Sequence, residues 1–488
     1  MPRPSLRQPK SCVCLIVALL TAAVTIGGAQ GPASNRLTLG GPAPVARTEA
    51  ELKAFLDELE IQEFALSNAL NVEQYYQWKG ETRHFAGPFA RLEADLASRK
   101  DYAAVIERWR GKVRDSTLAR RLFLHHRDFL IARADPRLPL RLVDLQATVQ
   151  DTLGQFRFEV RGQRLTGTAV YELTDTSADR SLREEAFRSR PQISPHLRRP
   201  IFEAMSLVDR IGRQQGFANG AAAGLELSSL ETATVLHDIE AFEQATRPAY
   251  LTILARVKSD LGVDRVEPWD IDYWLHRQEL SAGKDAWPKE PGLARLHDLM
   301  SGLGFAVDSL PIDVKVWDVP TGGITFFTRP PFDARLLTNP FTGATFYETL
   351  FHEYAHALNG TLMRPDLSPI FFRGDETPLG EGVAETLGHL AYDHHWLVRA
   401  AGVAPEQAER LEQVGKMELL LWLRRSITLQ AYTEISLYLH RRANPDSLYA
   451  AAYRRFTGAE LPPGDYVGGK DLFATGPLYA QSYLYANM

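Results

Sequence analysis

Apolar residues recur at three- and four-residue spacing along most of the chain after residue 48, a pattern typical of amphipathic helices. In the first such segment, Leu52, Phe55, Leu56 and Leu59 fall on one helical face. The same periodicity predicts helices over 49–80, 89–112, 117–134, 138–155, 199–215, 229–260, 343–360, 380–400, 405–442 and 446–456. The pattern therefore predicts a mostly α-helical protein.

Stretches with the composition of β-strands are few and short. Residues 156–160 and 168–173 are predicted to pair as a hairpin. Residues 314–316 and 324–328 are better candidates for a small sheet beside the later helices. The sequence contains no internal repeat, charge block or evident interdomain linker. We therefore expect 48–488 to form a single large helical domain, with two halves as the alternative arrangement.

The N-terminal segment has the pattern of a secretory signal peptide. Three basic residues precede an uncharged apolar run over 13–26, and Gly27-Gly28-Ala29 supplies small residues before Gln30. The apolar run is too short for a comfortable membrane span, and an uncleaved signal anchor is the alternative. We expect cleavage near Ala29, a flexible leader over 30–47, and an exported protein, periplasmic or secreted, whose mature chain has no membrane span.

Composition and charge narrow the function classes. The 488 residues are 45% hydrophobic and 24% charged, an ordinary globular balance that argues against disorder and a polytopic membrane protein. The formal net charge of −5 gives no basic footprint for nucleic acid, so no nucleic-acid partner is expected. Both cysteines, Cys12 and Cys14, lie within the predicted signal peptide, so the mature chain has neither disulfides nor thiolate metal sites.

The most informative motif is His352-Glu353-Tyr354-Ala355-His356, inside the predicted helix 343–360. An H-E-x-x-H motif on a helix places two imidazoles one turn apart on the same face, as two ligands of one tetrahedral zinc ion require. Glu353 is rotated about 100° from His352, so it can reach a metal-bound water without being a ligand. Two surface histidines on an ordinary helix are the alternative.

A third ligand must come from elsewhere in the chain. Asn359 and Leu362 stand where a metzincin carries glycine and histidine, which excludes that class. The later helix offers Glu381 and, one turn on, Glu385. Glu381 is favoured as the ligand and Glu385 as the acceptor that orients a ligating imidazole, although either carboxylate can be aimed at the metal. His389 lies too far along this helix to share the ion.

These motifs carry a family resemblance. The segment 351–358 followed by Glu381 resembles the gluzincin peptidases of the thimet oligopeptidase and oligopeptidase A family, and 372–385 gives a weaker echo of the angiotensin-converting enzyme family. Weaker resemblances to motifs of the thimet oligopeptidase and oligopeptidase A family lie in 215–219, 268–274 and 479–485. The resemblance implies a helical ellipsoid with a central substrate channel, one zinc ion and flexible oligopeptide substrates.

The resemblance also implies roles for residues outside the motif. Residues 324–327 occupy the place of a strand that pairs with bound peptide, although a plain core strand is an equal alternative. Tyr479 and Tyr483 are candidate donors to the reaction's oxyanion, or else buried core aromatics. The family usually carries a histidine shortly before these tyrosines, whereas here no histidine follows His440 and Asp471 or a neighbour occupies that region.

The sequence therefore predicts an exported, zinc-dependent peptidase of short peptides. His352, His356 and Glu381 would bind one zinc ion, and Glu353 would act as general base on the zinc-activated water. One alternative, motivated by the missing histidine, is a catalytically weak or inactive zinc- or peptide-binding protein on the same scaffold. Another is a dipeptidyl carboxypeptidase, for which the sequence identifies no clamp for a terminal carboxylate. Substrate preference and oligomeric state are left open.

Overall fold

The computed structural model describes residues 40–81, 85–283, 286–317, 319, 322–340, 343–372 and 378–488. The predicted signal peptide (1–29), most of the leader (30–47) and residues 373–377 lie outside the described residues. Within the described part, no helix combines the length and the apolar character needed to cross a membrane.

Helices make up most of the described chain. In chain order they are α1 (Glu49–Trp78), α2 (Ala86–Ala97), α3 (Lys100–Trp109), α4 (Ser116–Phe129), α5 (Arg137–Gln155), α6 (Gly167–Thr176), α7 (Arg180–Ser189), α8 (Ser194–Gln215), α9 (Gly220–Leu227), α10 (Thr232–Leu261), α11 (Ile271–Gly283), α12 (Gly292–Gly302), α13 (Ala344–Thr361), α14 (Pro378–His389), α15 (His394–Arg399), α16 (Pro405–Trp422), α17 (Leu429–Leu439), α18 (Pro445–Thr457), α19 (Leu472–Thr475) and α20 (Ala480–Ala486). A π-helical turn, η7 (Leu423–Thr428), joins α16 to α17.

The strands form two small sheets. β1 (Phe158–Val160) and β2 (Gln163–Leu165) make an antiparallel hairpin. β3 (Ile312–Val316), β4 (Gly323–Arg329) and β5 (Asp333–Thr338) form a sheet in the order β3-β5-β4, in which β5 runs parallel to β3 and antiparallel to β4. Among the described strands, β4 therefore pairs along one edge only.

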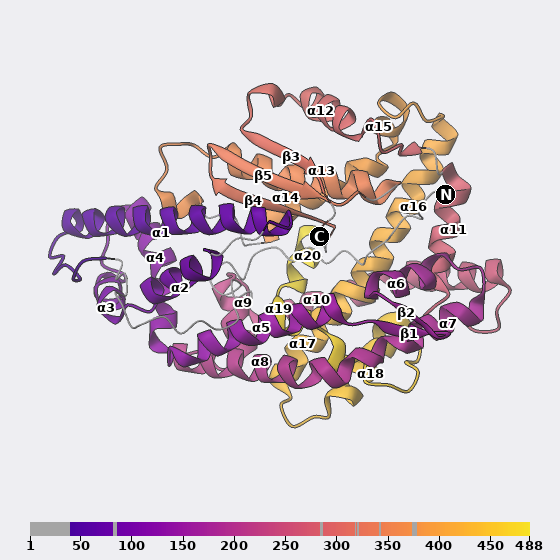
Figure 1. Cartoon of the computed structure of the whole chain (residues 1–488), viewed down its shortest axis with the longest axis horizontal. Helices are drawn as coiled ribbons and strands as arrows, with labels where there is room; N and C mark the ends of the chain where they lie inside the picture. Colours follow the sequence, from indigo (N-terminus) through magenta and orange to yellow (C-terminus); the bar gives the residue numbers. More distant parts are fainter. Residues whose placement is uncertain are drawn as a thin grey trace.

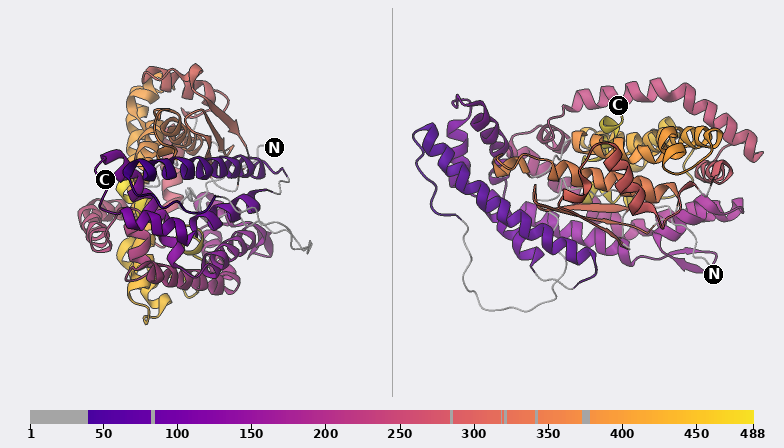
Figure 2. Two further views of the ribbon diagram at one scale, coloured as in Figure 1. Left: turned by 90° about the vertical axis from the view of Figure 1, so that its left-hand side faces the viewer. Right: turned by 90° about the horizontal axis from the view of Figure 1, so that it is seen from above.

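The three-stranded sheet lies beside the motif-bearing helix α13, which packs on β4 and β5. Figure 1 shows this sheet with α12–α15 (rose to orange) in one group of elements, and α5, α8, α17 and α18 (magenta and yellow) in a second group. The indigo helices α1–α4 gather at one end of the molecule, and the long helix α10 runs along one side (Figure 2). Helix α1 contacts β4.

The two largest groups of buried apolar side chains follow these two groups of elements. One includes Leu350 and Phe351 of α13, and the other includes Ile201 of α8 and Phe456 of α18. The run α16–η7–α17 supplies Leu421 to the first group and Leu423, Ile427 and Ile435 to the second. This continuous helical run therefore contributes buried side chains to both groups.

The expected mostly helical fold with a small sheet beside the motif-bearing helix is confirmed. The predicted helix 89–112 is instead two helices, α2 and α3, separated at Ser98 and Arg99. The sequence analysis also missed the central strand β5 and the short helices α6, α7, α9, α11, α12 and α20.

The second strand of the predicted hairpin, 168–173, is wrong, because these residues belong to α6. Arg161 and Gly162 have φ angles of 50° and 74°, so they form a tight turn that returns the chain at once into β2. Thr166 then caps the new helix by accepting a hydrogen bond from the amide of Ala169. Turn and cap together override the strand-like composition of 168–173.

Candidate metal centre

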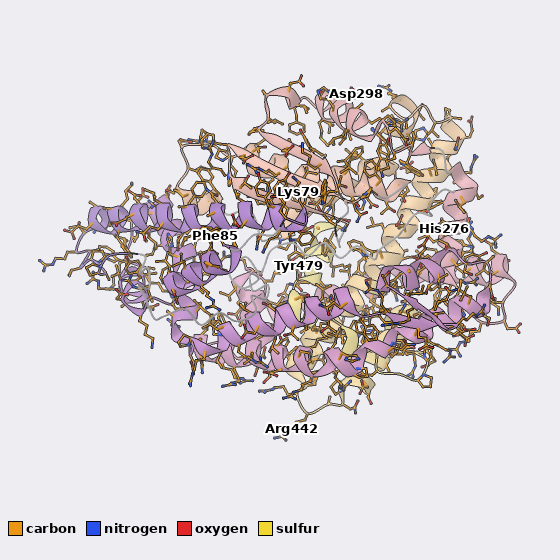
Figure 3. All side chains as sticks on the ribbon, viewed as in Figure 1. Lys79, Phe85, His276, Asp298, Arg442 and Tyr479 are labelled. Carbon is orange, nitrogen blue, oxygen red and sulfur yellow. The ribbon has the colours of Figure 1, made fainter. Side chains whose placement is uncertain are left out.

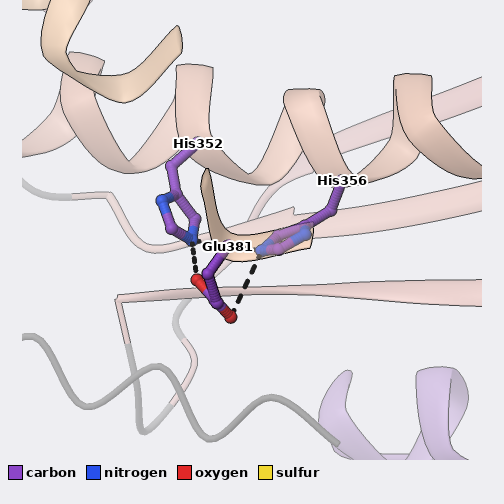
Figure 4. A group of neighbouring side chains, drawn as sticks. All are labelled: His352, His356 and Glu381. Carbon is purple, nitrogen blue, oxygen red and sulfur yellow. Dashed lines mark hydrogen bonds and ion pairs between the residues drawn. The ribbon is translucent and has the colours of Figure 1, made fainter. Parts of the chain in front are cut away.

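Helix α13 holds the two motif histidines inside the protein. Its apolar side chains, including Tyr347, Leu350 and Phe351, are fully buried, which fixes the rotation of the helix. His352 and His356 lie on one face, with only 6% and 8% of their surfaces exposed. Their Nε2 atoms are 3.2 Å apart. The two imidazoles therefore converge on one point beside the helix (Figure 4).

Helix α14 brings Glu381 to the same point. Its close approach to α13 depends on Gly388, since a Cβ atom there would lie 3.2 Å from the carbonyl oxygen of Glu348 and 3.3 Å from the Cβ of His352. Glu381 Oε2 lies 3.5 Å from His352 Nε2, and Glu381 Oε1 lies 3.8 Å from His356 Nε2. Figure 4 shows the carboxylate facing both rings.

The geometry of these three side chains fits a zinc ion. Metal–ligand distances of about 2.0–2.2 Å place the donors of a tetrahedral site about 3.3–3.6 Å apart, close to the 3.2, 3.5 and 3.8 Å separations here. Glu381 Oε2 is buried and has no hydrogen-bond partner in the described part of the chain. Across that part, His352, His356 and Glu381 are the one group of three donors that could hold a metal ion.

Burial and neighbouring charges act on each of these groups. Burial, with a further contribution from the neighbouring His352, lowers the pKa of His356 to about 4, so this ring is neutral near pH 7, as a ligating imidazole must be. Burial also acts to lower the pKa of His352, but the hydrogen bond to Glu385 and the charge of Glu381 outweigh it and raise this pKa to about 9. Burial raises the pKa of Glu381, against the charge of His352 and the hydrogen bond from Tyr479.

Glu385 lies behind His352. Its Oε1 atom is 3.3 Å from His352 Nδ1, on the side of the ring away from Glu381. Its Oε2 atom is 3.3 Å from His389 Nε2 and accepts a hydrogen bond of 3.2 Å from the Asn487 amide. His389 Nε2 in turn lies 2.8 Å from Asn487 Oδ1. The carboxylate that orients His352 is thus itself fixed from two sides.

Glu353 is fully buried between α13 and strand β4. The Thr325 hydroxyl lies 2.9 Å from Glu353 Oε2 and 2.8 Å from the backbone oxygen of Glu353. At Gly323, a Cβ atom would lie 2.5 Å from Glu353 Cγ. The glycine therefore lets the strand approach the glutamate closely, and the threonine fixes its carboxylate.

Both candidate tyrosines lie at the site. The Tyr479 hydroxyl donates a hydrogen bond to Glu381 Oε1, and Tyr479 occupies the middle of the molecule (Figure 3). The Tyr483 ring contacts Tyr479 and Trp422, with ring centroids 5.5 and 5.4 Å away. A cavity of about 40 Å³ beside His352 is lined by Gly322, Glu348, Thr349, His352, Glu385, Gly388, His389, Trp422 and Tyr483.

Several residues of this site escaped the sequence analysis. Thr325, Gly323, Trp422 and Asn487 belong to no motif, and only the strand-like run around Thr325 gave a weak signal. His389 was expected not to share the metal, and the structure places it against Glu385.

No protein-family model and no curated protein matches the sequence. Solved structures do match the fold. A carboxypeptidase from Pyrococcus furiosus has a TM-score of 0.62 at 15% identity over 91% of this chain and 85% of its own. A putative oligoendopeptidase F has a TM-score of 0.63 at 14% identity over 91% and 82%. PZ peptidase A has a TM-score of 0.58 at 15% identity over 90% and 81%. The chain therefore has the fold of these peptidases.

Proposed function

We propose that this protein is a zinc-dependent peptidase that hydrolyses short peptides. The observation that carries the proposal is the buried group of His352, His356 and Glu381, whose donor atoms are spaced for one tetrahedral ion. Its fold is similar to those of solved structures of a carboxypeptidase, a putative oligoendopeptidase and PZ peptidase A, which supports the same conclusion.

The donor set favours zinc over the hard cations. Two imidazole nitrogens and one carboxylate oxygen suit zinc, whereas magnesium and calcium prefer oxygen ligands. Three protein ligands leave a fourth position of the tetrahedron for water or substrate. When bound, zinc lowers the pKa of a coordinated water to about 7 and polarises the scissile carbonyl.

Glu353 is the general base of this proposal. Its carboxylate accepts the proton of the attacking water and passes it to the leaving amine. Thr325 holds Oε2 by a hydrogen bond of 2.9 Å, which limits rotation of the carboxylate and keeps its other oxygen in one place. Burial of the whole side chain excludes bulk water from this proton transfer.

Tyr483 is the better candidate for the donor to the developing oxyanion. The hydroxyl of Tyr479 already donates to Glu381, so its first role is to orient that carboxylate. Tyr483 borders the cavity beside His352 and is held by ring contacts with Tyr479 and Trp422. A donor fixed in this way stabilises negative charge without reorganising during the reaction.

Strand β4 is the proposed peptide-binding element. It pairs with β5 along one edge, and its residues Gly323 and Thr325 lie against the general base. An extended peptide added as a further strand would present a backbone carbonyl to the metal site.

The proposal also includes export of the protein. A mature N-terminus at Gln30 in the secreted or periplasmic protein would support export.

The test measures zinc content and peptide cleavage together for the full chain and for Glu353→Gln. We expect about one zinc per chain in both proteins, and a loss of cleavage of at least a hundredfold in Glu353→Gln. Full activity in the variant would remove Glu353 from the mechanism. A zinc-loaded wild-type protein that cleaves no oligopeptide would overturn the peptidase and favour a peptide-binding protein on the same scaffold.

Carboxypeptidase action is a second candidate, since the fold is shared with a carboxypeptidase. Masses of the products from one defined peptide separate the modes of cleavage. Release of single residues or dipeptides from the C-terminus indicates an exopeptidase, whereas internal fragments indicate an endopeptidase.

A further inference from the structure

A cavity of about 40 Å³ lies directly against the candidate metal centre, because His352 forms part of its wall. Thr349 of α13 and Gly388 of α14 form another part. Trp422, the last residue of α16, and Tyr483 of α20 form an aromatic part of the wall. We name this space the His352 cavity.

The walls of the His352 cavity are held in place by packing. The Trp422 ring contacts the Tyr483 ring, with centroids 5.4 Å apart, and Tyr483 contacts Tyr479 at 5.5 Å. Helix α14 lies so close to α13 that a Cβ atom on Gly388 would be 3.3 Å from the Cβ of His352. Such walls cannot move apart without disturbing this packing, so the volume of the cavity limits what it can hold.

The volume of the cavity corresponds to a small chemical group. A cavity of about 150 Å³ in a protein core accommodates benzene. On the same scale, about 40 Å³ holds only about one or two non-hydrogen atoms. The methyl group of alanine and the hydroxymethyl group of serine fit this space, and the larger side chains of leucine and phenylalanine exceed it. Glu348 and Glu385 also line the cavity, so a serine hydroxyl or a water molecule has acceptors there.

The location of the cavity matches that of a side chain next to the scissile bond. In the proposed mechanism the scissile carbonyl lies at the metal site and Tyr483 donates to its oxyanion, and both His352 and Tyr483 border the cavity. Gly322, which also borders it, directly precedes β4. A peptide paired with β4 therefore passes the cavity, and its residues follow one another at about 3.3 Å. The nearest side chains are those that flank the scissile bond.

We propose that the His352 cavity is the subsite for a side chain next to the scissile bond, and that its size restricts this residue to glycine, alanine or serine. Trp422 is the specificity-determining residue, because it is the largest side chain of the wall and is not one of the three proposed ligands. The inference rests on the proposed peptidase function and adds to it the substrate class, short peptides with a small residue at the cleaved bond.

Binding to the zinc-loaded, full-length Glu353→Gln protein tests the proposal without cleavage. Each position of one short fluorescent peptide is changed in turn to Gly, Ala, Ser, Leu or Phe. At one position we expect the Leu and Phe peptides to bind at least about tenfold more weakly than the Gly, Ala and Ser peptides. The masses of the products that the wild-type protein releases should place that position next to the cleaved bond.

Two substitutions in the wall should shift this preference in opposite directions. Trp422→Leu enlarges the cavity, so the Leu peptide should gain at least about fivefold in affinity, with the Kd of the Ala peptide changed less than about twofold. Thr349→Leu fills the cavity, so the Ala peptide should bind at least about fivefold more weakly than the Gly peptide. Zinc content should be unchanged in both variants. A general loss of stability would weaken the binding of every peptide and would not produce two opposite shifts.

Trp109→Leu is the matched control. Like Trp422, Trp109 is a half-buried tryptophan at the end of a helix. It belongs to α3, in the group of helices at one end of the molecule (Figure 1), and is not among the residues that line the cavity. This variant should keep the full preference for small residues.

Three results would overturn the assignment: no position with a preference for small residues, a preference that is unchanged in Trp422→Leu, or a preference at a position away from the cleaved bond. The first is the result expected if the cavity holds only water. If Trp422→Leu does not fold, Thr349→Leu decides, because an unchanged ratio between the Ala and Gly peptides also overturns the assignment. The peptidase proposal fails separately, when the zinc-loaded wild-type protein cleaves none of the peptides that the Glu353→Gln protein binds.

Discussion

The Thr325 hydroxyl lies within hydrogen-bond distance of both the carboxylate and the backbone oxygen of Glu353, at 2.9 and 2.8 Å. A single side chain from the edge strand β4 thereby fixes Glu353, the proposed general base, relative to the helix that carries His352 and His356. The proposed peptide-binding strand and the proposed base are in direct contact, so a substitution in the strand should alter the position of Glu353.

Thr325→Val should lower kcat about tenfold, because Glu353 loses the hydrogen bond that orients it while the side-chain shape is kept. Zinc content should be unchanged, since Thr325 touches none of the three ligands. Thr325→Ser restores the hydroxyl and should recover most of the activity. Steady-state kinetics with parallel metal analysis checks this, and equal kcat values for the valine and wild-type proteins would contradict it.

Gly323→Ala adds only one methyl group, but it should impair catalysis strongly. The new methyl group would lie 2.5 Å from Glu353 Cγ, a distance that real Cβ atoms do not adopt, so the strand or the glutamate must move. We expect kcat/KM to fall about a hundredfold with zinc retained. Gly154→Ala is the control, because a methyl group added there would point into open space, with no packing neighbour within 4 Å. Unchanged kinetics in Gly323→Ala would show that β4 adjusts freely.

The recognisable part of the site is the part that helix geometry determines. His352 and His356 had to share a face because they are four residues apart on one helix, and Glu381 and Glu385 had to lie one turn apart on another. The structure places Glu381 at the Nε2 atoms and Glu385 at Nδ1 of His352. Periodicity likewise predicted the long helices.

Contacts between distant segments were not predictable in this way. Thr325 contacts Glu353, which is 28 residues away in the sequence, and Asn487 contacts Glu385, which is 102 residues away. No rule of sequence spacing predicts contacts between such positions. The hairpin error at 168–173 has a similar origin, because a turn at Arg161 and Gly162 and a cap at Thr166 outweighed the local composition.

Asn487→Ala should weaken zinc binding. The amide of Asn487 holds Glu385 at 3.2 Å and lies 2.8 Å from His389, and Glu385 in turn orients the ligand His352. Loss of such outer contacts typically costs 10- to 100-fold in metal affinity. Competition with a chelator of known affinity measures the effect. The neighbouring Met488 is 68% exposed, so Met488→Ala should leave zinc affinity unchanged.

Because of Glu434, the folded protein should become less stable as the pH rises. This glutamate on α17 is 1% exposed, and burial raises its pKa to about 8, against the hydrogen bond that its carboxyl group accepts from the amide of Leu478. The folded protein therefore holds a proton that the unfolded chain, with a pKa of 4.5, releases. Its contribution to stability is complete below pH 4.5 and is lost as the pH rises to about 8.

Glu434→Gln should remove this dependence, because a glutamine is neutral at every pH and its carbonyl can still accept from Leu478. We expect the Tm of the variant to exceed that of the wild type by about a few degrees at pH 9 and to match it at pH 5. Thermal unfolding of both zinc-loaded proteins across this range checks the sign. A Tm difference that does not change between pH 5 and pH 9 would mean that Glu434 titrates normally. Leu478 directly precedes Tyr479, whose hydroxyl donates a hydrogen bond to Glu381. The same series therefore also reports whether the proton on Glu434 stabilises the segment that contains Tyr479.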